Sequence, residues 1–275
     1  MSMQKMSEYT HYLVAITGAG RGLGKHIALQ TAKTLTAVKQ SSRLDFVLIG
    51  RDRDMLRGVA DAVSTDDGRI RAWVCAGVDL GAKDFGRVGV GEVEAMLGTV
   101  RKEIEKDTEQ PRVSAMLVQN AGTLGDLSAK LGEHDLEFFE DYYRLNLTSF
   151  TMLCAMFIKW VQGWDCQEAT IVNISSLLAI EAHPYWSLYS TVKAARDHLM
   201  RVVAKEEGPK IQTLNYAPGQ LDSDMQAIVR ETLGDADQRR MYMLMSEDGA
   251  LVRLEESARA LAHLLVSNHF ESGSH

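Results

Sequence analysis

The sequence predicts an α/β fold in which one doubly wound parallel sheet is covered by helices on both faces. Three observations predict this class. Short continuous apolar runs alternate with longer helix-length stretches from one end of the chain to the other. A glycine-rich segment, T-G-A-G-R-G-L-G (17–24), joins the first apolar run to the first helical stretch. No linker, repeat or low-complexity tract divides the 275 residues, so we expect a single domain over residues 1–275.

Six apolar runs are expected to form the strands. They are continuous rather than alternating, as is typical of strands buried on both faces of a sheet. The expected strands are 12–17, 45–50, 70–76, 114–120, 169–175 and 211–216. The expected helices are about 23–39, 53–64, 92–107, 137–163 and 187–206. The glycine-rich stretch 77–98 is expected to be a long connection that leaves the third strand.

Composition and charge favour a soluble globular protein of the cytoplasm. Hydrophobic residues make up 45% of the chain, charged residues make up 24%, and the formal net charge is −7. This acidic balance argues against nonspecific binding to nucleic acid or to an anionic membrane. The three cysteines lie far apart without a C-x-x-C pattern, which suits a reducing compartment. No run approaches the roughly 18 apolar residues of a membrane span, and the N-terminus lacks the apolar core of a signal peptide.

The glycine-rich segment is predicted to be the phosphate-binding loop of a Rossmann domain. Its place between a strand and a helix gives the pattern its meaning. Gly18 permits a tight turn, whereas Gly22 and Gly24 remove Cβ atoms where backbone approaches a pyrophosphate and where the helix packs on the strand. The helix N-terminus then offers free N–H groups to the phosphates. The predicted cofactor-binding residues of this segment are Gly18, Gly20, Arg21, Gly22, Leu23 and Gly24.

The end of the second strand favours NADP(H) over NAD(H). An NAD site usually places an Asp or Glu there, which binds the ribose 2′-hydroxyl. Here Gly50 is followed by Arg51, whose guanidinium can bind a 2′-phosphate. Arg21 is expected to flank the same phosphate. We interpret the negative Asp52 as the cap of the helix that begins near Arg53.

Two further segments are predicted to contact the cofactor. Asp79 and Leu80 follow the third strand, where a carboxylate can accept a hydrogen bond from the adenine amino group. An aspartate that only closes a turn or caps a helix is the alternative. The motif N-A-G ends the fourth strand, where small residues let a cofactor lie against the backbone. The predicted binding residues of this motif are Asn120, Ala121 and Gly122.

A serine, a tyrosine and a lysine are predicted to form a carbonyl-reducing site. The motif V-N-I-S-S (172–176) ends the fifth strand, and ligands of doubly wound sheets lie at the carboxyl ends of strands. Tyr189 and Lys193 are four residues apart, so they share one face of the next helix. The serine, either Ser175 or Ser176, would polarise the substrate carbonyl, and the phenol would donate a proton to the developing alkoxide.

The lysine is expected to adjust the acidity of the tyrosine. A free phenol has a pKa of about 10. A nearby ammonium stabilises the phenolate and lowers that value, and the positive charge of oxidised nicotinamide acts in the same direction. Lys193 is also expected to bind the nicotinamide ribose, so Tyr189 and Lys193 both count as cofactor contacts.

Together, these motifs resemble the short-chain dehydrogenase/reductase family. T-G-x-x-x-G-x-G, N-A-G, N-x-S-S and Y-x-x-x-K occur in this order, each on the expected element. The resemblance implies a fourth catalytic residue, an asparagine that supports a proton-relay water, and Asn146 corresponds to it. It also implies that backbone groups of Pro218, Gly219 and Leu221 bind the nicotinamide carboxamide. The family's homodimer, in which the helices near 137–163 and 187–206 pack across a two-fold axis, is expected here too.

Within this family, the sequence resembles the sepiapterin reductases. The segments that carry the likeness are N-A-G-T-L-G-D (120–126), L-N-L-T-S (145–149), V-N-I-S-S-L (172–177), Y-S-T-V-K-A-A-R-D (189–197), L-N-Y-A-P-G-Q-L-D-S-D-M-Q (214–226) and F-E-S-G-S-H (270–275). On that pattern the catalytic serine is Ser176, thirteen residues before Tyr189. The resemblance implies NADPH-dependent reduction of side-chain carbonyls on a pterin, as in tetrahydrobiopterin synthesis. In those enzymes a pterin-anchoring aspartate follows the S-G-x-H segment, and the sequence here ends at His275.

The loops after the fifth and sixth strands are predicted to border the substrate. A flat, partly apolar ring would suit a wall made by an aromatic residue and a methionine. The alternative is that Trp186 and Met225 belong to a packed lid. The predicted substrate-binding residues are Ser176, Leu177, Trp186, Tyr189 and Met225. The two aspartates of D-S-D (222–224) are interpreted as helix caps rather than as a cation site. The eight histidines show no metal-binding spacing, so no metal is predicted.

Three functions are compatible with these observations. The first is an NADPH-dependent carbonyl reductase of the sepiapterin reductase type. The second keeps the chemistry but acts on α-dicarbonyls or aromatic ketones. The third is a dinucleotide-binding regulator without turnover, which the complete set of Asn146, Ser176, Tyr189 and Lys193 argues against.

Overall fold

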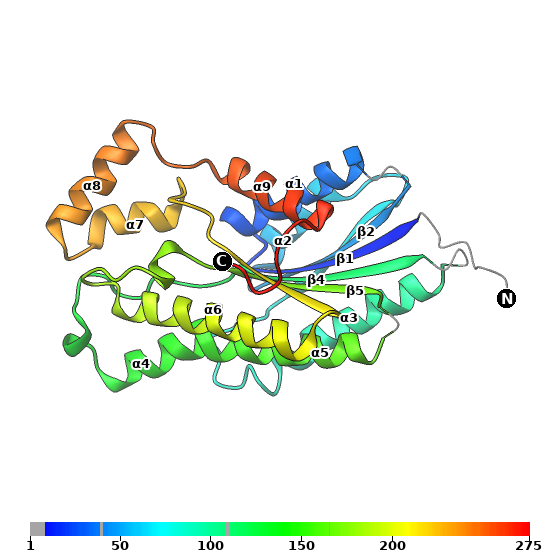
Figure 1. The fold of residues 1–275 in the computed structure, drawn as a ribbon, viewed down its shortest axis with the longest axis horizontal. Coiled ribbons are helices and arrows are strands. Elements are labelled where there is room, and N and C mark those ends of the chain that lie inside the picture. The colour runs from blue at the N-terminus through cyan, green and yellow to red at the C-terminus, as the bar shows by residue number, and fades with distance from the viewer. Residues whose placement is uncertain (1–8, 39–40, 108–110, 165) are drawn as a thin grey trace.

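A six-stranded parallel sheet forms the centre of the molecule (Figure 1). The computed structural model describes residues 9–38, 41–107, 111–164 and 166–275. The strands are β1 (Thr10–Thr17), β2 (Arg43–Gly50), β3 (Ile70–Ala76), β4 (Arg112–Gln119), β5 (Glu168–Ile174) and β6 (Ile211–Tyr216). Their order across the sheet is β3-β2-β1-β4-β5-β6. The order reverses between β1 and β4, and ligands of doubly wound sheets bind beside such a reversal, at the carboxyl ends of the strands.

Helices cover both faces of this sheet (Figure 1). One face carries α1 (Gly22–Val38), α2 (Arg53–Val63) and α9 (Leu254–Ser267). The other carries α3 (Gly89–Glu105), α5 (Ser149–Gln162) and α6 (Ser187–Glu207). A π-helical segment, η2 (Arg144–Thr148), joins α4 (Leu136–Tyr143) to α5. After β6, α7 (Asp224–Thr232) and α8 (Ala236–Glu247) lie together at the left end of the view. Two short 3-10 turns are η1 (Leu131–Glu133) and η3 (Leu177–Ala179).

Alternate residues of each strand enter two separate hydrophobic cores. In β1, Leu13 and Ala15 pack with α3, α5 and α6. Val14 and Ile16 pack with α1, α2 and α9, and all four side chains are fully buried. Because successive side chains point to opposite faces, a sheet covered on both sides needs apolar residues at every position. This explains why the strands are continuous apolar runs.

The structure confirms the predicted fold class, and each strand lies within two residues of its predicted ends. The predicted helix 137–163 was wrong as one element, because the π-helical turn divides it into α4 and α5. The connection predicted over 77–98 was too long, since α3 begins at Gly89. A Cβ at that position would lie 2.3 Å from the ring of Phe85, so Gly89 lets the helix start against this ring. The predictions for residue 39 and for the first eight residues lie outside the described ranges.

No residue range was predicted for three of the helices. They are α7, α8 and α9, which follow β6. Met225, expected in a loop, lies in the first turn of α7. D-S-D does lie at the start of a helix, but the interpretation of its aspartates as the caps was wrong. The N-cap of α7 is Ser223, whose side chain accepts a hydrogen bond from Gln226 N at 3.3 Å. Within the described ranges, no helix combines the length and apolarity needed to cross a bilayer.

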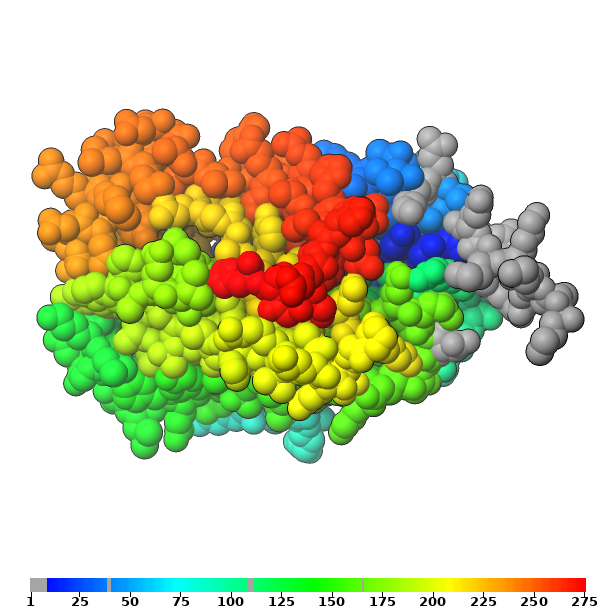
Figure 2. Space-filling view, viewed as in Figure 1, coloured from blue at the N-terminus to red at the C-terminus, as the bar shows by residue number. Residues whose placement is uncertain are grey.

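The C-terminal residues lie beside β6. Gly273 N donates to Thr213 O at 2.8 Å, and Asn215 N donates to Ser274 O at 3.0 Å. Figure 2 shows these residues in red across the middle of one face, next to the yellow segment that includes β6. His275 Nδ1 lies 3.0 Å from Asp197 Oδ2 of α6. The end of the described chain is therefore held against both β6 and α6.

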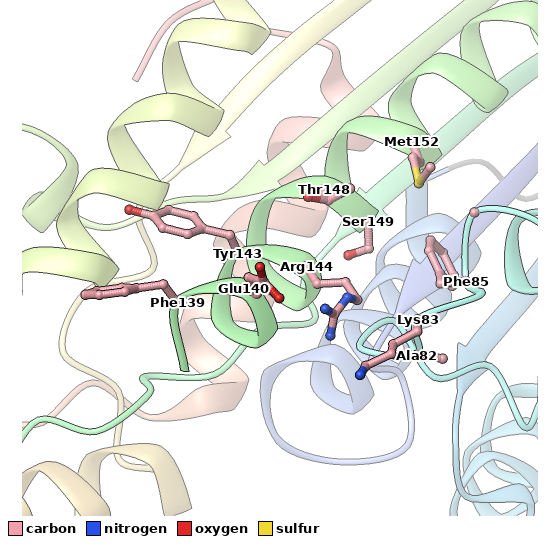
Figure 3. Close-up of a pocket in the computed structure, with 11 residues that line it drawn as sticks. Ala82, Lys83, Phe85, Phe139, Glu140, Tyr143, Arg144, Thr148, Ser149 and Met152 are labelled. Atoms are coloured by element: carbon pink, nitrogen blue, oxygen red, sulfur yellow. The ribbon is translucent and has the colours of Figure 1, made fainter. Parts of the chain in front are cut away.

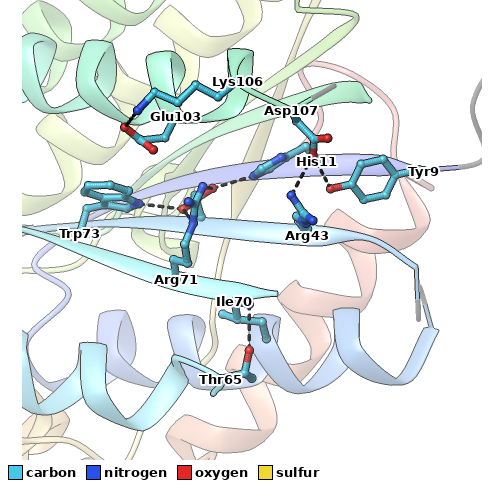
Figure 4. Close-up of polar contacts among 11 residues, drawn as sticks. Tyr9, His11, Arg43, Thr65, Ile70, Arg71, Trp73, Glu103, Lys106 and Asp107 are labelled. Carbon is cyan, nitrogen blue, oxygen red and sulfur yellow. Dashed lines mark hydrogen bonds and ion pairs between the residues drawn. The ribbon is translucent and has the colours of Figure 1, made fainter. Parts of the chain in front are cut away.

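A buried polar cluster joins the amino-terminal halves of β1, β2 and β3 (Figure 4). The carboxylate of Asp45, 0% exposed, accepts hydrogen bonds from Arg71 Nε at 2.9 Å, Arg71 Nη2 at 2.8 Å and Trp73 Nε1 at 2.7 Å. His11 Nε2 lies 2.6 Å from Asp45 Oδ2. Burial acts to raise the pKa of Asp45, but the hydrogen bonds from His11, Arg71 and Trp73 outweigh it and hold this pKa below its usual value. The cluster lies at the end of the sheet opposite the glycine-rich loop.

Candidate active site

The loop between β1 and α1 has the geometry of a phosphate-binding loop. Gly18 and Gly22 adopt φ angles of 65° and 53°, in the left-handed region that glycine enters without strain. A Cβ at Gly24 would lie 2.3 Å from Gly18 O, so only glycine fits where α1 packs against the loop. Gly22 is exposed as the first residue of α1, so N–H groups of this helix end can approach a pyrophosphate. These residues fit a dinucleotide.

The N-A-G motif holds this loop against the end of β4. Thr17 Oγ1 accepts hydrogen bonds from Asn120 N and Ala121 N, each at 3.0 Å. Asn120 Nδ2 donates to Thr17 O at 3.0 Å. A Cβ at Gly122 would lie 3.1 Å from Asn146 Oδ1, so this glycine lets Asn146 approach. The motif therefore connects the glycine loop to the segment that carries Asn146.

At the carboxyl end of β2, the structure tests the prediction for Asp52 but not the prediction for Arg51. Asp52 Oδ1 accepts from Asp54 N and Met55 N, both at 2.9 Å, which confirms that Asp52 caps α2. Arg51 is exposed. Arg21 lies with Nη1 3.6 Å from Asp224 Oδ2 at the start of α7, and both side chains are largely exposed. Such an exposed ion pair contributes little stability, so it does not fix Arg21 in place.

Asp79 closes a turn after β3. Its Oδ1 accepts a hydrogen bond from Gly81 N at 2.9 Å, and the residue is exposed. This contact matches the turn alternative that the sequence left open. Leu80 is partly buried against the core formed with α3 and α5.

The two serines after β5 have different environments. Ser175 is 2% exposed, and its hydroxyl donates to Asp197 Oδ1 at 2.6 Å. Ser176 is partly exposed and accepts a hydrogen bond from Leu178 N at 3.2 Å. A hydrogen bond between Ser176 and Tyr189 acts to lower the pKa of the phenol. The structure thus brings Ser176, and not Ser175, to the tyrosine.

Tyr189 and Lys193 lie on one face of α6, as their spacing predicts. Lys193 Nζ is 5.4 Å from the centroid of the Tyr189 ring. The ammonium also donates to Ile174 O at the end of β5. Burial, together with the positive charge of Arg196, lowers the pKa of Lys193 to about 7.

The acidity of Tyr189 differs from the expectation. Burial raises the pKa of Tyr189 above its usual value and outweighs the hydrogen bond with Ser176 and the charge of Arg196, which both act to lower it. The predicted lowering by Lys193 was therefore wrong.

Asn146 lies in the π-helical segment and is 3% exposed. Its Oδ1 accepts from Thr123 N at 2.9 Å, and its Nδ2 donates to Tyr142 O at 3.1 Å. Its main-chain oxygen accepts from Arg196 Nε. A π-helical turn inserts one residue into a helix and so changes the direction of its side chains. Here it lets Asn146 reach the loop after β4.

Trp186 belongs to a packed lid next to Tyr189. It is 3% exposed, and its ring centroid lies 5.6 Å from that of Tyr189. Its Nε1 donates to Gln238 Oε1 of α8 at 3.0 Å. Val229 and Leu233 of the α7 segment share its hydrophobic cluster. For Trp186 the packed-lid alternative matches the structure better than an open substrate wall.

Leu177 and Met225 remain accessible near this lid, at 52% and 38% exposed. Tyr242 of α8 packs against the cluster of Trp186, and its charge state influences Tyr189. The sequence analysis missed Tyr242 because α8 itself was not predicted. Tyr185 packs against the same cluster, so apolar side chains and phenols border the lid.

The segment from Pro218 to Leu221 is anchored at the carboxyl end of β6. Gly219 has a φ of 82°, in the left-handed region. Val252 N donates to Gln220 O at 2.9 Å, and Ser257 Oγ donates to Pro218 O at 2.9 Å. Contact of these residues with a nicotinamide stays a prediction.

A separate pocket of about 460 Å³ lies between the β3–α3 connection and the start of α5 (Figure 3). Its walls include Lys83, Phe85, Tyr143, Arg144 and Met152. None of the predicted site residues lines it. Among the described residues, no group of three or more His, Cys, Asp and Glu side chains is arranged to hold a metal ion.

Comparison with known proteins identifies the family. The sequence pattern of the short chain dehydrogenase family matches residues 12–234. The chain belongs to the short chain dehydrogenase family. Members of this family bind a nicotinamide dinucleotide, and the glycine loop described above fits such a ligand. The chain is therefore an oxidoreductase that acts on CH–OH and C=O groups.

Individual relatives of this short chain dehydrogenase cover nearly its whole length. Sepiapterin reductase of Mus musculus is 37% identical over 261 residues, which are 94% of this chain and 94% of that enzyme. Benzil reductase ((S)-benzoin forming) of Bacillus cereus is 28% identical over 265 residues, which are 94% of this chain and 96% of that enzyme. A solved actinorhodin polyketide ketoreductase with NADPH has a TM-score of 0.72 at 21% identity, covering 96% of this chain and 94% of that chain. These likenesses confirm the fold and the resemblance to sepiapterin reductases.

Sequence reasoning missed two residues that hold the site together. Thr17 joins the glycine loop to N-A-G through its hydroxyl. The Nε of Arg196 donates a hydrogen bond to the main-chain oxygen of Asn146, and the charge of Arg196 acts to lower the pKa of Tyr189. The helical spacing contained a signal for Arg196, because this residue is three positions after Lys193 and shares its face of α6.

Proposed function

We propose that this chain is an NADPH-dependent carbonyl reductase of the sepiapterin reductase type, which reduces side-chain keto groups of a pterin. The observation that carries the proposal is the meeting of Ser176, Tyr189 and Lys193 at the carboxyl end of β5. The near full-length likeness to sepiapterin reductase of Mus musculus supports the pterin substrate.

Each side chain has a distinct task in the proposed mechanism. NADPH, when bound, supplies the hydride. The Ser176 hydroxyl donates a hydrogen bond to the substrate carbonyl, and the Tyr189 phenol gives its proton to the developing alkoxide. Because burial raises the pKa of Tyr189, the phenol stays protonated and ready to act as an acid near neutral pH. Asn146 orders the loop after β4 through Thr123 N and, as the resemblance implies, supports a proton-relay water.

The cofactor is proposed to be held by the glycine loop and by the residues at the ends of β2, β3, β4 and β6. The 2′-phosphate is assigned to Arg51, with Arg21 beside it. Lys193 would bind the nicotinamide ribose, and Asp79 with Leu80 would border the adenine. The exposed guanidinium of Arg51 and the engagement of Asp52 as a cap support NADPH over NADH.

Substitution of Arg51 tests the choice of cofactor. Arg51→Ala is expected to raise KM for NADPH about 10- to 100-fold, because a charge-assisted hydrogen bond contributes about 1.5–3 kcal/mol. KM for NADH should change little, since NADH lacks the 2′-phosphate. Arg53→Ala is the matched control, as Arg53 is also an exposed arginine at the start of α2. An equal rise in KM for both cofactors would refute the assignment.

The substrate is tested by the loss of NADPH absorbance when purified protein meets sepiapterin. Reactions with a simple diketone and with NADH run in parallel. Turnover of sepiapterin with NADPH is the expected result. Turnover of the diketone alone would support the proposed catalytic residues and refute the assignment of a pterin as the substrate. Tight NADPH binding without reduction of any carbonyl would favour the dinucleotide-binding regulator.

A second candidate function is the reduction of α-dicarbonyls or aromatic ketones. It is supported by the 28% identity to benzil reductase of Bacillus cereus over 94% of this chain. The apolar side chains of Leu177 and Met225, which are both exposed, suit such a substrate. The diketone arm of the assay distinguishes this candidate.

We further propose a homodimer, in a single-domain subunit of the cytoplasm. The resemblance to the family supports pairing through α5 and α6, as does the exposure of Met152 on α5. The three cysteines are free and buried, which suits a reducing compartment. Sedimentation of the purified protein at the mass of two chains is the expected result.

A further inference from the structure

Tyr185 has a backbone conformation that is rare for a large side chain. Its φ angle is 71°, in the left-handed region. Among the described residues, the other non-glycine with a positive φ is Asn268, the C-cap of α9, where this conformation is common. For a bulky residue the conformation is strained, and such strain persists where the surroundings hold it, often at functional sites. Tyr185 directly precedes Trp186 and α6, so the strain lies beside the proposed site.

The ring of Tyr185 lies against the corner between α7 and α8. A Cβ at Gly234, in this corner, would lie 2.2 Å from Tyr185 Cε1 and 2.8 Å from Ser128 O, so the ring fits only because residue 234 is glycine. Gly234 N donates to Leu127 O at 2.9 Å. Lys130 Nζ lies 5.6 Å from the centroid of the Tyr185 ring, a cation–π contact. The ring thus contacts both the helical corner and the loop after β4.

Gln238 attaches α8 to the residues on both sides of Tyr185. Its Nε2 donates to Pro184 O at 3.3 Å, and its Oε1 accepts from Trp186 Nε1 at 3.0 Å. Gln238 N donates to Asp235 Oδ1 at 3.0 Å, within the first turn of α8. No residue of α8 is buried, so the amide of Gln238 is an important attachment of this helix.

Trp186 carries this attachment to the reacting phenol. Its ring packs edge to face with that of Tyr189, with centroids 5.6 Å apart and an angle of 65° between the planes. Tyr185 and Tyr189 both pack against the hydrophobic cluster that contains Trp186. A displacement of α8 would therefore move the indole and loosen the packing of Tyr189.

We propose that Gln238 and Tyr185 are positioning residues that set the size of substrate the active site admits. Gln238 fixes the Trp186 indole against Tyr189, and Tyr185 fixes the corner between α7 and α8 beside it. Together they confine the space next to the phenol, so the site favours compact carbonyl compounds over those with bulky aryl groups. This inference rests on the proposed carbonyl reduction and deepens it.

Two substitutions at Gln238 test the attachment. Gln238→Met keeps the length of the side chain but removes both hydrogen bonds. Gln238→Glu removes the donor to Pro184 O and keeps an acceptor for Trp186 Nε1, so it should preserve the position of the indole. Gln162→Met is the matched control, since the Gln162 amide also joins two elements, through Glu207 Oε2 at 2.8 Å, but lies at the end of α5.

The first readout is the quenching of Trp186 fluorescence by acrylamide, taken as the difference between each protein and its Trp186→Phe form. In the parent, Trp186 is 3% exposed and should be shielded. Gln238→Met should make it accessible to the quencher, whereas Gln238→Glu and Gln162→Met should leave it shielded. This measurement needs no turnover, so it tests the positioning of Trp186 even if no carbonyl is reduced.

The second readout is selectivity between two diketones of different size, diacetyl and benzil, with NADPH. Gln238→Met should raise the ratio of kcat/KM for benzil to that for diacetyl by about tenfold or more, a range typical of changed pocket size. Gln238→Glu should restore the parent ratio. A role in stability alone would change the melting temperature without changing this ratio.

Two substitutions at Tyr185 test the strained residue. Tyr185→Gly and Tyr185→Ala both remove the ring and should raise the same selectivity ratio. They differ in the backbone, because glycine adopts a φ of 71° without strain and alanine does not. The melting temperature of Tyr185→Gly should therefore exceed that of Tyr185→Ala by about 2 °C or more. The reverse order would refute the strained conformation.

The remaining outcomes separate the parts of the proposal. If Trp186 stays shielded in Gln238→Met, Gln238 does not position it. If Trp186 becomes accessible but the selectivity ratio stays at the parent value in both Gln238→Met and Tyr185→Gly, the two residues do not set the substrate size. Absence of carbonyl reduction by the parent, with a quenching change in Gln238→Met alone, would refute the proposed function and leave the positioning of Trp186 supported.

Discussion

Tyr189→Phe is expected to lower kcat for carbonyl reduction by about 10²- to 10⁴-fold, the contribution typical of a positioned general acid. The substitution removes one oxygen and with it both the proton donor and the hydrogen bond with Ser176. The ring should keep its place, because it packs edge-on against Trp186 at 5.6 Å. Affinity for NADPH, measured by fluorescence titration, should change little.

Tyr143→Phe provides a matched control for this experiment. Tyr143 is also partly buried, but it lines the separate pocket beside η2 rather than the proposed site. Its loss of a hydroxyl should leave kcat near the parent value. Parent-like reduction by Tyr189→Phe would remove the tyrosine from the mechanism. Loss of NADPH binding by that variant would show that the Tyr189 hydroxyl helps to bind the cofactor.

Asp45→Ala is expected to lower the free energy of unfolding by about 3 kcal/mol. Removing one member of a buried charged cluster typically costs about 3–5 kcal/mol, and the lower end applies because the Arg71 side chain is 37% exposed. The change leaves His11 buried without its carboxylate partner. Urea denaturation measures the effect, with Asp61→Ala as the control, since Asp61 is an exposed aspartate on α2. Equal stability of the two variants would contradict the expectation.

The same cluster should make stability depend on pH in acid. The pKa of Asp45 in the folded protein lies below its usual value, because the hydrogen bonds from His11, Arg71 and Trp73 outweigh burial. A carboxyl with a lowered folded pKa stabilises the protein above its unfolded pKa of about 3.9 and loses this contribution as the pH falls through the folded value. The difference in stability between the parent and Asp45→Ala should therefore narrow below about pH 4. A difference that stays constant to lower pH would show that Asp45 does not titrate in this way.

The sequence predicted the strands well because each one is buried on both faces. Runs such as that of β1 then need apolar residues at every position, and the signal is strong. The glycine loop was equally easy to predict, since its backbone angles and close contacts exclude most residues other than glycine. Tyr189 and Lys193 followed from helical spacing. The strand end indicated Ser175 or Ser176, and the resemblance to the sepiapterin reductases selected Ser176. Their roles remain predictions that the experiments above test.

The parts that were missed depend on contacts between distant segments. In α8 no residue is buried, so the helix has no apolar stripe to reveal it. The π-helical turn at Arg144–Thr148 lies within a continuous helical pattern, and its bonds to Thr123 and Arg196 come from other elements. The acidity of Tyr189 was predicted in the wrong direction because a spacing shows which charges are near but not how deeply the phenol is buried.

The C-terminal residues beside β6 have a consequence for how copies of this protein behave in concentrated solution. β6 is the last strand of the sheet, and the unpaired backbone groups of an outer strand are a template for pairing with another chain. Gly273 and Ser274 occupy some of those groups, at Thr213 and Asn215. The residues beside β6 thus hinder edge-to-edge aggregation, and His275 also shields the buried carboxylate of Asp197.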